Sequence, residues 1–103
     1  MDRSTDGPTQ QQLLDLVQAW LDGSIATDAF EASYWPTRRR LLQSDPTIFT
    51  GFFGEAMSAV DLAVDAMSDD DRVIGSIPEH QARREVAVAM DQLRHLAPNI
   101  FPQ

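Results

Sequence analysis

The feature that most constrains this chain is the recurrence of apolar residues three and four positions apart in four separate segments. That spacing places an apolar stripe along one side of a 3.6-residue helix. No segment alternates apolar and polar residues between hairpin turns, as a β-strand would. One stripe cannot hold a helix together in water, so the four stripes are expected to be buried together. The short connections favour antiparallel neighbours, and the sequence predicts an all-α fold, an antiparallel four-helix bundle.

Boundary residues are clearest for the first and last helices. Thr9 and Gln12 have the spacing of a capping box, and Gly23 is a natural stop. Ser76 and Glu79 have the same capping-box spacing. Two prolines mark the expected first turn and end of this last helix: Pro78 and Pro98.

The two middle helices have boundary signals of other kinds. Ile25 and Phe30 have the separation of a hydrophobic staple at the start of the second helix. Pro36 lacks an amide proton, so that helix is expected to be kinked there or to restart after it. Asp45 and Pro46 predict the start of the third helix, as N-cap and first helical residue.

The periodicity also defines an expected core and domain organisation. Residues 9–97 are predicted to form one four-helix domain, with a disordered polar lead-in at 1–8 and a short tail at 98–103. The expected buried residues are Leu13, Leu16, Val17, Trp20, Leu21, Phe30, Tyr34, Leu41 or Leu42, Phe49, Phe52 or Phe53, Ala56, Val60, Ala63, Val64, Met67, Ala82, Val86, Ala89, Met90, Leu93, and Leu96 or Ala97.

Charge and composition exclude several classes of function. The chain has 16 acidic and 8 basic residues among 103, a formal charge of -8, and all the bases are arginine. Direct binding of nucleic acid phosphates is therefore not expected. The absence of cysteine excludes disulfides and thiolate chemistry. Residues 1–10 resemble neither a signal nor a transit peptide, and no apolar run approaches about 20 residues, so we expect a cytoplasmic protein with no membrane partner.

Signals for catalysis and metal binding are weak. His80 and His95 are fifteen residues apart on one expected helix, about 22 Å, too far to share a metal. Neither belongs to the Glu-x-x-His pattern of di-iron bundles. The sequence contains no nucleophile elbow, Walker loop or dinucleotide-binding glycine motif. We therefore expect no enzymatic activity, no metal and no cofactor.

The charged clusters allow two interpretations. The basic clusters, Arg38–Arg40 and Arg83–Arg84, are interpreted as partners of nearby acids or of a helix dipole rather than as a phosphate patch. Asp61 and Asp65 are one helical turn apart with no base three or four residues after either of them. Such a cluster serves either solubility or the docking of a basic partner. The acidic candidates for docking are Glu55, Asp61, Asp65, Asp69, Asp70 and Asp71.

The order of several short motifs resembles a known family. The run from Leu13 to Ile25, LLDLVQAWLDGSI, is followed by Phe30, Tyr34 and the segment Arg38–Leu41. This order is similar to the N-terminal half of the colicin D-type immunity proteins. The similarity continues through Gly54-Glu55, the aspartate-rich turn at 69–72 and the last helix, and spans about residues 11–97.

The resemblance implies a four-helix antiparallel bundle that binds the nuclease domain of a cognate bacterial toxin. In the colicin D system the toxin cleaves tRNA in the anticodon loop, and acidic side chains of the immunity protein stand in for RNA phosphates. Glu55 matches the acid of the Gly-Glu segment, and Asp61, Asp65 and Asp69–Asp71 lie in the acidic stretch that follows. The free protein is expected to be a monomer or a weak dimer. The alternative is a small acidic helical adaptor for another basic protein.

Overall fold

The computed structural model of the protein describes residues 9–67 and 76–100. This part of the chain forms four α-helices and a short 3-10 helix: α1 (Gln10–Leu21), α2 (Thr27–Ser44), α3 (Gly51–Ala66), α4 (Glu79–Leu96) and η2 (Pro98–Ile100). Among the described residues there is no strand, and the only β-type pairing is an isolated bridge between Met67 and Ile77. The expected all-α class and the expected number of long helices are confirmed.

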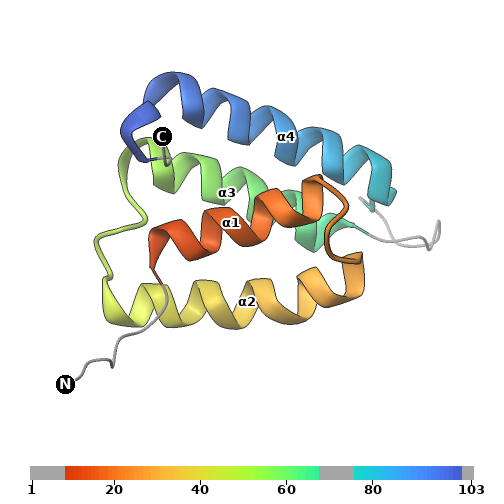
Figure 1. Ribbon diagram of the computed structural model, residues 1–103, viewed down its shortest axis with the longest axis horizontal. Coiled ribbons are helices and arrows are strands. Elements are labelled where there is room, and N and C mark those ends of the chain that lie inside the picture. Colours follow the sequence, from red (N-terminus) through yellow and green to blue (C-terminus); the bar gives the residue numbers. More distant parts are fainter. Residues whose placement is uncertain (1–8, 68–75, 101–103) are drawn as a thin grey trace. The chain divides into compact units, whose positions relative to one another are not determined.

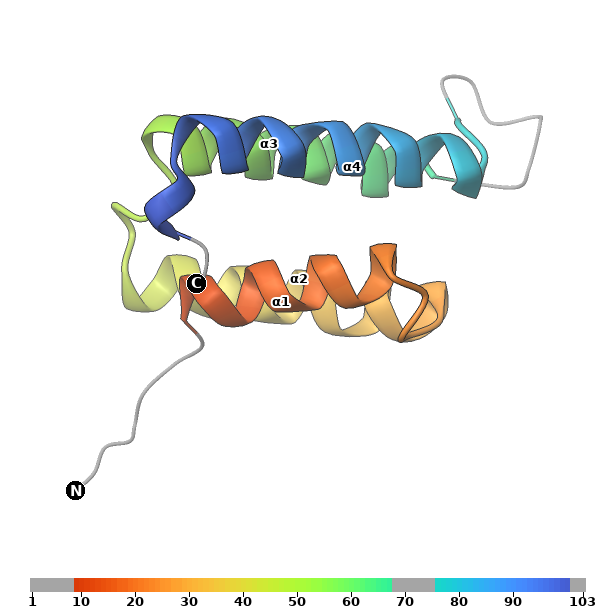
Figure 2. The same ribbon diagram turned by 45° about the horizontal axis from the view of Figure 1, so that its top comes forward.

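The helices are organised as two helical hairpins. The chain divides between Phe49 and Thr50 into two compact units. In the first unit α1 and α2 run antiparallel side by side, and in the second α3 and α4 do the same (Figures 1 and 2). The association of the two hairpins into one bundle stays a prediction.

Both ends of α1 agree with the sequence analysis. Thr9 is the N-cap: its backbone N–H donates to Gln12 Oε1 over 2.8 Å, and its Oγ1 accepts from the Gln12 backbone N–H over 3.1 Å. At the other end Gly23 has a φ of +82°, a conformation that glycine adopts at little cost. The N–H groups of Gly23 and Ser24 donate to the carbonyls of Trp20 and Ala19, the two bonds of a Schellman motif.

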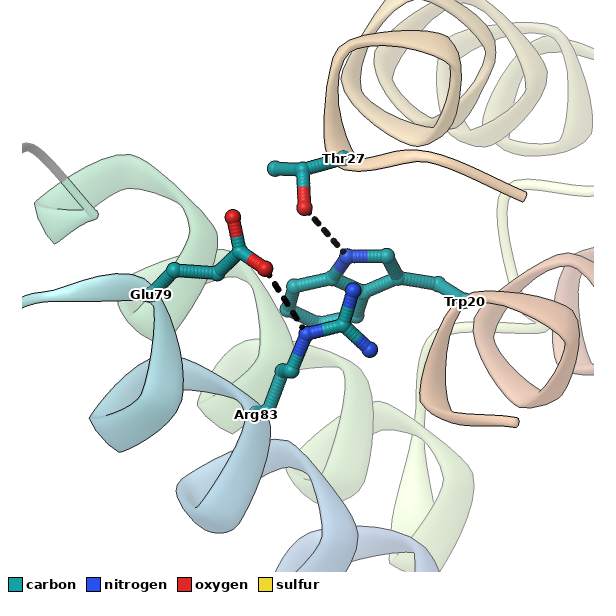
Figure 3. Close-up of polar contacts among 4 residues, drawn as sticks. All are labelled: Trp20, Thr27, Glu79 and Arg83. Atoms are coloured by element: carbon teal, nitrogen blue, oxygen red, sulfur yellow. Dashed lines mark hydrogen bonds and ion pairs between the residues drawn. The ribbon is translucent and has the colours of Figure 1, made fainter. Parts of the chain in front are cut away.

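An aromatic row joins α1 to α2. The Trp20 and Phe30 rings are stacked with centroids 4.4 Å apart, and Tyr34 follows at 5.3 Å from Phe30. All three side chains are fully buried. The indole N–H of Trp20 donates to Thr27 Oγ1 over 3.1 Å (Figure 3). The row therefore gives the first hairpin both apolar contact and a satisfied polar group.

The second helix is continuous. α2 runs from Thr27 to Ser44 with Pro36 inside it, so the expectation of a restart after Pro36 is wrong. The proline removes one hydrogen bond to the carbonyl of Ala32, but the turns on both sides continue the same helix. Ala26 is the N-cap, which places Ile25 and Phe30 at the two positions of a hydrophobic staple.

The predicted start of the third helix is wrong. Asp45 is the C-cap of α2, and the backbone N–H of Ile48 donates to the Asp45 carbonyl over 3.1 Å, closing a turn with Pro46 at its second position. Asp45 Oδ1 accepts from the Thr47 hydroxyl over 2.8 Å. Aspartate followed by proline is favoured in such turns as well as at helix starts. α3 begins at Gly51, five residues after the predicted first helical residue Pro46. The φ of Gly51 is +60°, a left-handed conformation that glycine adopts at little cost.

The predicted capping box of the last helix is also wrong. The N-cap of α4 is Pro78, and no side chain caps this helix. Just before Pro78, the Ile77 N–H donates to the Ala66 carbonyl over 2.9 Å. This bond belongs to the bridge between Met67 and Ile77, which holds Ile77 beside the end of α3. The helix therefore starts later than a Ser76 cap would require. Its end was predicted correctly, because Pro98 follows the C-cap Ala97.

The structure decides which members of adjacent apolar pairs are buried. Leu41 and Phe53 are buried, whereas Leu42 and Phe52 are exposed. Leu96, expected in the core as an alternative to Ala97, is exposed as well, and Ala97 is half-buried. Met57 is fully buried although it was not in the expected set. Among the described residues, the buried side chains are Leu13, Leu14, Val17, Trp20, Phe30, Tyr34, Leu41, Phe53, Ala56, Met57, Val60, Ala63, Val64, Ala82, Val86, Ala89, Met90 and Leu93.

Candidate functional site

The three described acidic candidates all lie on α3 but not on one line. Asp61 and Asp65 are one turn apart on the same flank of the helix, and we call them the acidic pair. Asp65 is exposed and Asp61 is half-buried. At about 100° per residue, Glu55 points about 120° away from Asp61 and about 80° away from Asp65. The helix therefore separates Glu55 from the acidic pair. The other candidates, Asp69, Asp70 and Asp71, lie outside the described residues.

Glu55 instead belongs to a groove between α3 and α4. This hollow measures about 310 Å³ including its open side, and we call it the α3–α4 groove. Its walls are apolar except for Glu55 and Gln92, and among the described residues Glu55 is the only charged one that lines it. The groove is lined by Phe52, Glu55, Ala56, Ala59, Ala89, Gln92, Leu93 and Leu96.

Large apolar side chains are exposed in and beside this groove. Phe52 and Leu96, in its walls, are 48% and 55% exposed. Leu62 on α3 and Val88 on α4 are 72% and 53% exposed. Helical spacing places Leu62 on the flank of α3 that carries Ala59, and Val88 one turn before Gln92. The second hairpin therefore presents apolar surface to the outside in addition to its buried stripe.

One arginine of each cluster makes a defined local contact. Arg83 Nε lies 3.0 Å from Glu79 Oε2, an ion pair within the first two turns of α4 (Figure 3). The Arg38 guanidinium lies over the Phe49 ring at 4.4 Å from its centroid. The Arg83–Glu79 ion pair agrees with the interpretation of the arginines as partners of nearby acids. The triplet Arg38–Arg40, however, precedes the last turn of α2, which contains no base. A role at the dipole of that helix end is therefore wrong.

No arrangement of metal ligands is present in the part of the chain that the structure describes. His80 and His95 are both exposed on α4, near its opposite ends. His95 Nδ1 lies 3.3 Å from the Asp91 carbonyl of the preceding turn. Among the described helices, none combines the length and apolar character needed to span a membrane.

Sequence reasoning missed the α3–α4 groove. It assigned Leu96 or Ala97 and one of Phe52 and Phe53 to the core, so an exposed member of each pair was not considered as a binding residue. The available signal was the pair Phe52-Phe53 itself. Two adjacent residues of a helix point about 100° apart, so one of them can face solvent while the other is buried.

Comparison of the chain with protein-family models, with curated proteins and with solved structures finds no match.

Proposed function

We propose that this protein is an immunity protein that binds and inhibits a basic nuclease toxin, a tRNase of the colicin D kind, in the cytoplasm of the cell that makes both. The observation that carries the proposal is the acidic pair on α3 in a chain with a formal charge of -8. The resemblance of the run Leu13–Ile25 and the motifs after it to colicin D-type immunity proteins supports the same function.

The physical basis of the proposal is electrostatic. A nuclease that binds RNA carries basic side chains where the phosphates lie. Carboxylates one turn apart can occupy such positions and exclude the RNA. Opposite charge also speeds the encounter of the two proteins, and close charge pairs at such an interface contribute several kcal/mol. Asp61 and Asp65 would therefore act as phosphate mimics, together with Asp69, Asp70 and Asp71.

The first test is a titration of this protein against the candidate toxin domain encoded beside its gene. The readout is cleavage of tRNA at two salt concentrations, with the complex measured separately by calorimetry. We expect protection that is complete at a fixed molar ratio and weaker at high salt. Absence of both protection and a complex would contradict this pairing.

The second test reverses the charge of the acidic pair. The double variant Asp61→Arg with Asp65→Arg is expected to weaken toxin binding by several kcal/mol without loss of helical circular dichroism. The matched control, Asp15→Arg with Asp91→Arg, makes the same change in net charge at exposed acids of α1 and α4. Equal affinity of the two double variants would place the interface elsewhere.

The alternative function is an adaptor that binds a different basic protein. It shares the acidic residues with the immunity function but requires no effect on a nuclease. A complex with a basic protein that leaves tRNA cleavage unchanged would favour the adaptor.

A further inference from the structure

We propose that the α3–α4 groove is a docking site for a basic amphipathic helix of a partner protein. The proposal concerns a surface on the second hairpin that the acidic pair does not form. It does not require that the partner is a nuclease, so it stands or falls separately from the immunity function.

The groove is hollow because small side chains line its floor. Ala56, Ala59 and Ala89 leave space between two antiparallel helices, and the larger Phe52 and Leu96 stand at one end of it. A helix laid along two antiparallel helices places its side chains into such spaces, as ridges pack into grooves. A leucine-sized anchor from the partner would fill the hollow over the alanines.

The exposed apolar side chains extend this surface along both helices. Beyond the hollow, Leu62 continues the flank of α3 and Val88 that of α4, and both are more than half exposed. A partner helix with apolar residues at positions i, i+3, i+4 and i+7 would contact them together with the anchor. This length of apolar surface suits a helix of several turns better than a small molecule, which needs a more enclosed pocket.

Charge complementarity decides the kind of helix. Of the described residues that line the groove, Glu55 is the one that carries a charge, and none is basic. Glu85 lies one turn before Ala89 on the same flank of α4, where its Oε2 accepts from Gln81 Nε2 over 3.0 Å. Glu55 and Glu85 therefore place one carboxylate at or beside the groove on each helix. They would be matched by lysines or arginines that flank the apolar face of the partner helix.

The test uses a synthetic peptide of about 18 residues, five helical turns, with leucines at the four spacings above and lysines on both sides of them. The peptide is titrated into the full-length, isotope-labelled protein, and the backbone amide signals are followed by NMR. We expect the perturbed signals to cluster in residues 52–62 and 85–96. A second peptide has glutamate in place of every lysine, and a third has the same composition with the leucines scattered around the helix. Both are expected to bind at least about tenfold more weakly.

Variants of exposed groove residues give an independent readout. Leu96→Gln and Glu55→Gln are each expected to weaken binding of the lysine peptide about tenfold, and Ala59→Arg to block it by filling the hollow with a like charge. The matched controls are Leu42→Gln, an exposed leucine of α2, and Asp65→Gln, an acid of the acidic pair, both expected to bind within about twofold of the unchanged protein. Circular dichroism and thermal unfolding of each variant exclude loss of folding as the cause.

Three results would overturn the proposal. These are perturbed signals confined to residues outside the second hairpin, equal binding of the lysine and glutamate peptides, and loss of binding in the control variants but not in the groove variants. Sedimentation of the free protein tests a further occupant, since a homodimer disrupted by Leu96→Gln would assign the groove to a second copy. Failure of the lysine peptide to bind would also overturn this proposal but would leave the toxin titration unaffected, so the two proposals fail separately.

Discussion

At the scale of single residues, some side chains of the first hairpin make both an apolar contact and a hydrogen bond. Trp20 stacks on Phe30 and also donates its indole N–H to Thr27. Because Trp20 is fully buried, that N–H needs a partner inside the protein. Thr27 therefore contributes to the contact between α1 and α2 as well as to the first turn of α2.

The Thr27→Val variant tests this contribution. Valine has nearly the shape of threonine but cannot accept a hydrogen bond, so we expect the free energy of unfolding to fall by about 1–3 kcal/mol. Urea unfolding followed by circular dichroism measures the change. Thr27→Ser keeps the acceptor and should lose less. An unchanged midpoint for the valine variant would mean that this bond contributes nothing to stability.

Gly23 is the residue whose backbone conformation most limits substitution in the first hairpin. A Cβ built on it meets no atom within 4 Å, so the cost of a side chain comes from its φ of +82° alone. We expect Gly23→Ala to lower the free energy of unfolding by about 1–2 kcal/mol. Thermal and urea unfolding are the measurements. Gly23→Asn should lose clearly less, since asparagine adopts this conformation more readily; equal losses would point to a cause other than the backbone.

At the scale of helices, local sequence signals predicted helix boundaries correctly where residues close in sequence form all the contacts. They were unreliable at prolines, which are favoured both in turns and at helix starts. The capping box and the glycine stop of α1 were predicted correctly because all their partners lie within five residues. Asp45-Pro46 formed a turn, and Pro78 took the cap position in place of Ser76. In both cases the sequence allowed two local structures, and contacts with the preceding helix selected one.

Pro36 offers a prediction at this scale. A proline in a helix interior is less favourable than alanine by about 3 kcal/mol. Proline also restricts the unfolded chain, which offsets up to about 1 kcal/mol of this loss in stability. Since α2 is continuous through Pro36, we expect Pro36→Ala to raise the free energy of unfolding by about 2 kcal/mol. Differential scanning calorimetry should show a higher melting temperature. A lower one would mean that the ring makes a contact more valuable than the missing hydrogen bond.

At the scale of the whole molecule, the dominant property is its negative charge. A formal charge of -8 produces a field that attracts a basic partner over about 30 Å at 0.01 M salt but only about 8 Å at 0.15 M. The field acts on the rate at which two proteins meet more than on the rate at which they part. The proposed recognition of a basic partner would therefore depend on the overall surplus of acids as well as on the acidic pair.

This reasoning predicts the kinetics of the proposed toxin complex. Between these two salt concentrations we expect the association rate constant to fall by about tenfold or more, with little change in the dissociation rate constant. Stopped-flow fluorescence measures both. The Asp61→Arg and Asp65→Arg double variant, with its smaller net charge, should depend less steeply on salt. A salt effect confined to dissociation would contradict long-range attraction.

The sequence by itself determined the helical class, the number of long helices and most of the buried residues, because a 3.6-residue periodicity is a property of each segment alone. It also singled out the acids of α3. Only the tertiary structure decided between Phe52 and Phe53, between Leu41 and Leu42, and on the exposure of Leu96. The rotation of a helix about its axis is set by the neighbour it contacts, and so is any hollow left between the two. The α3–α4 groove therefore depends on the pairing of α3 with α4, which no single segment encodes.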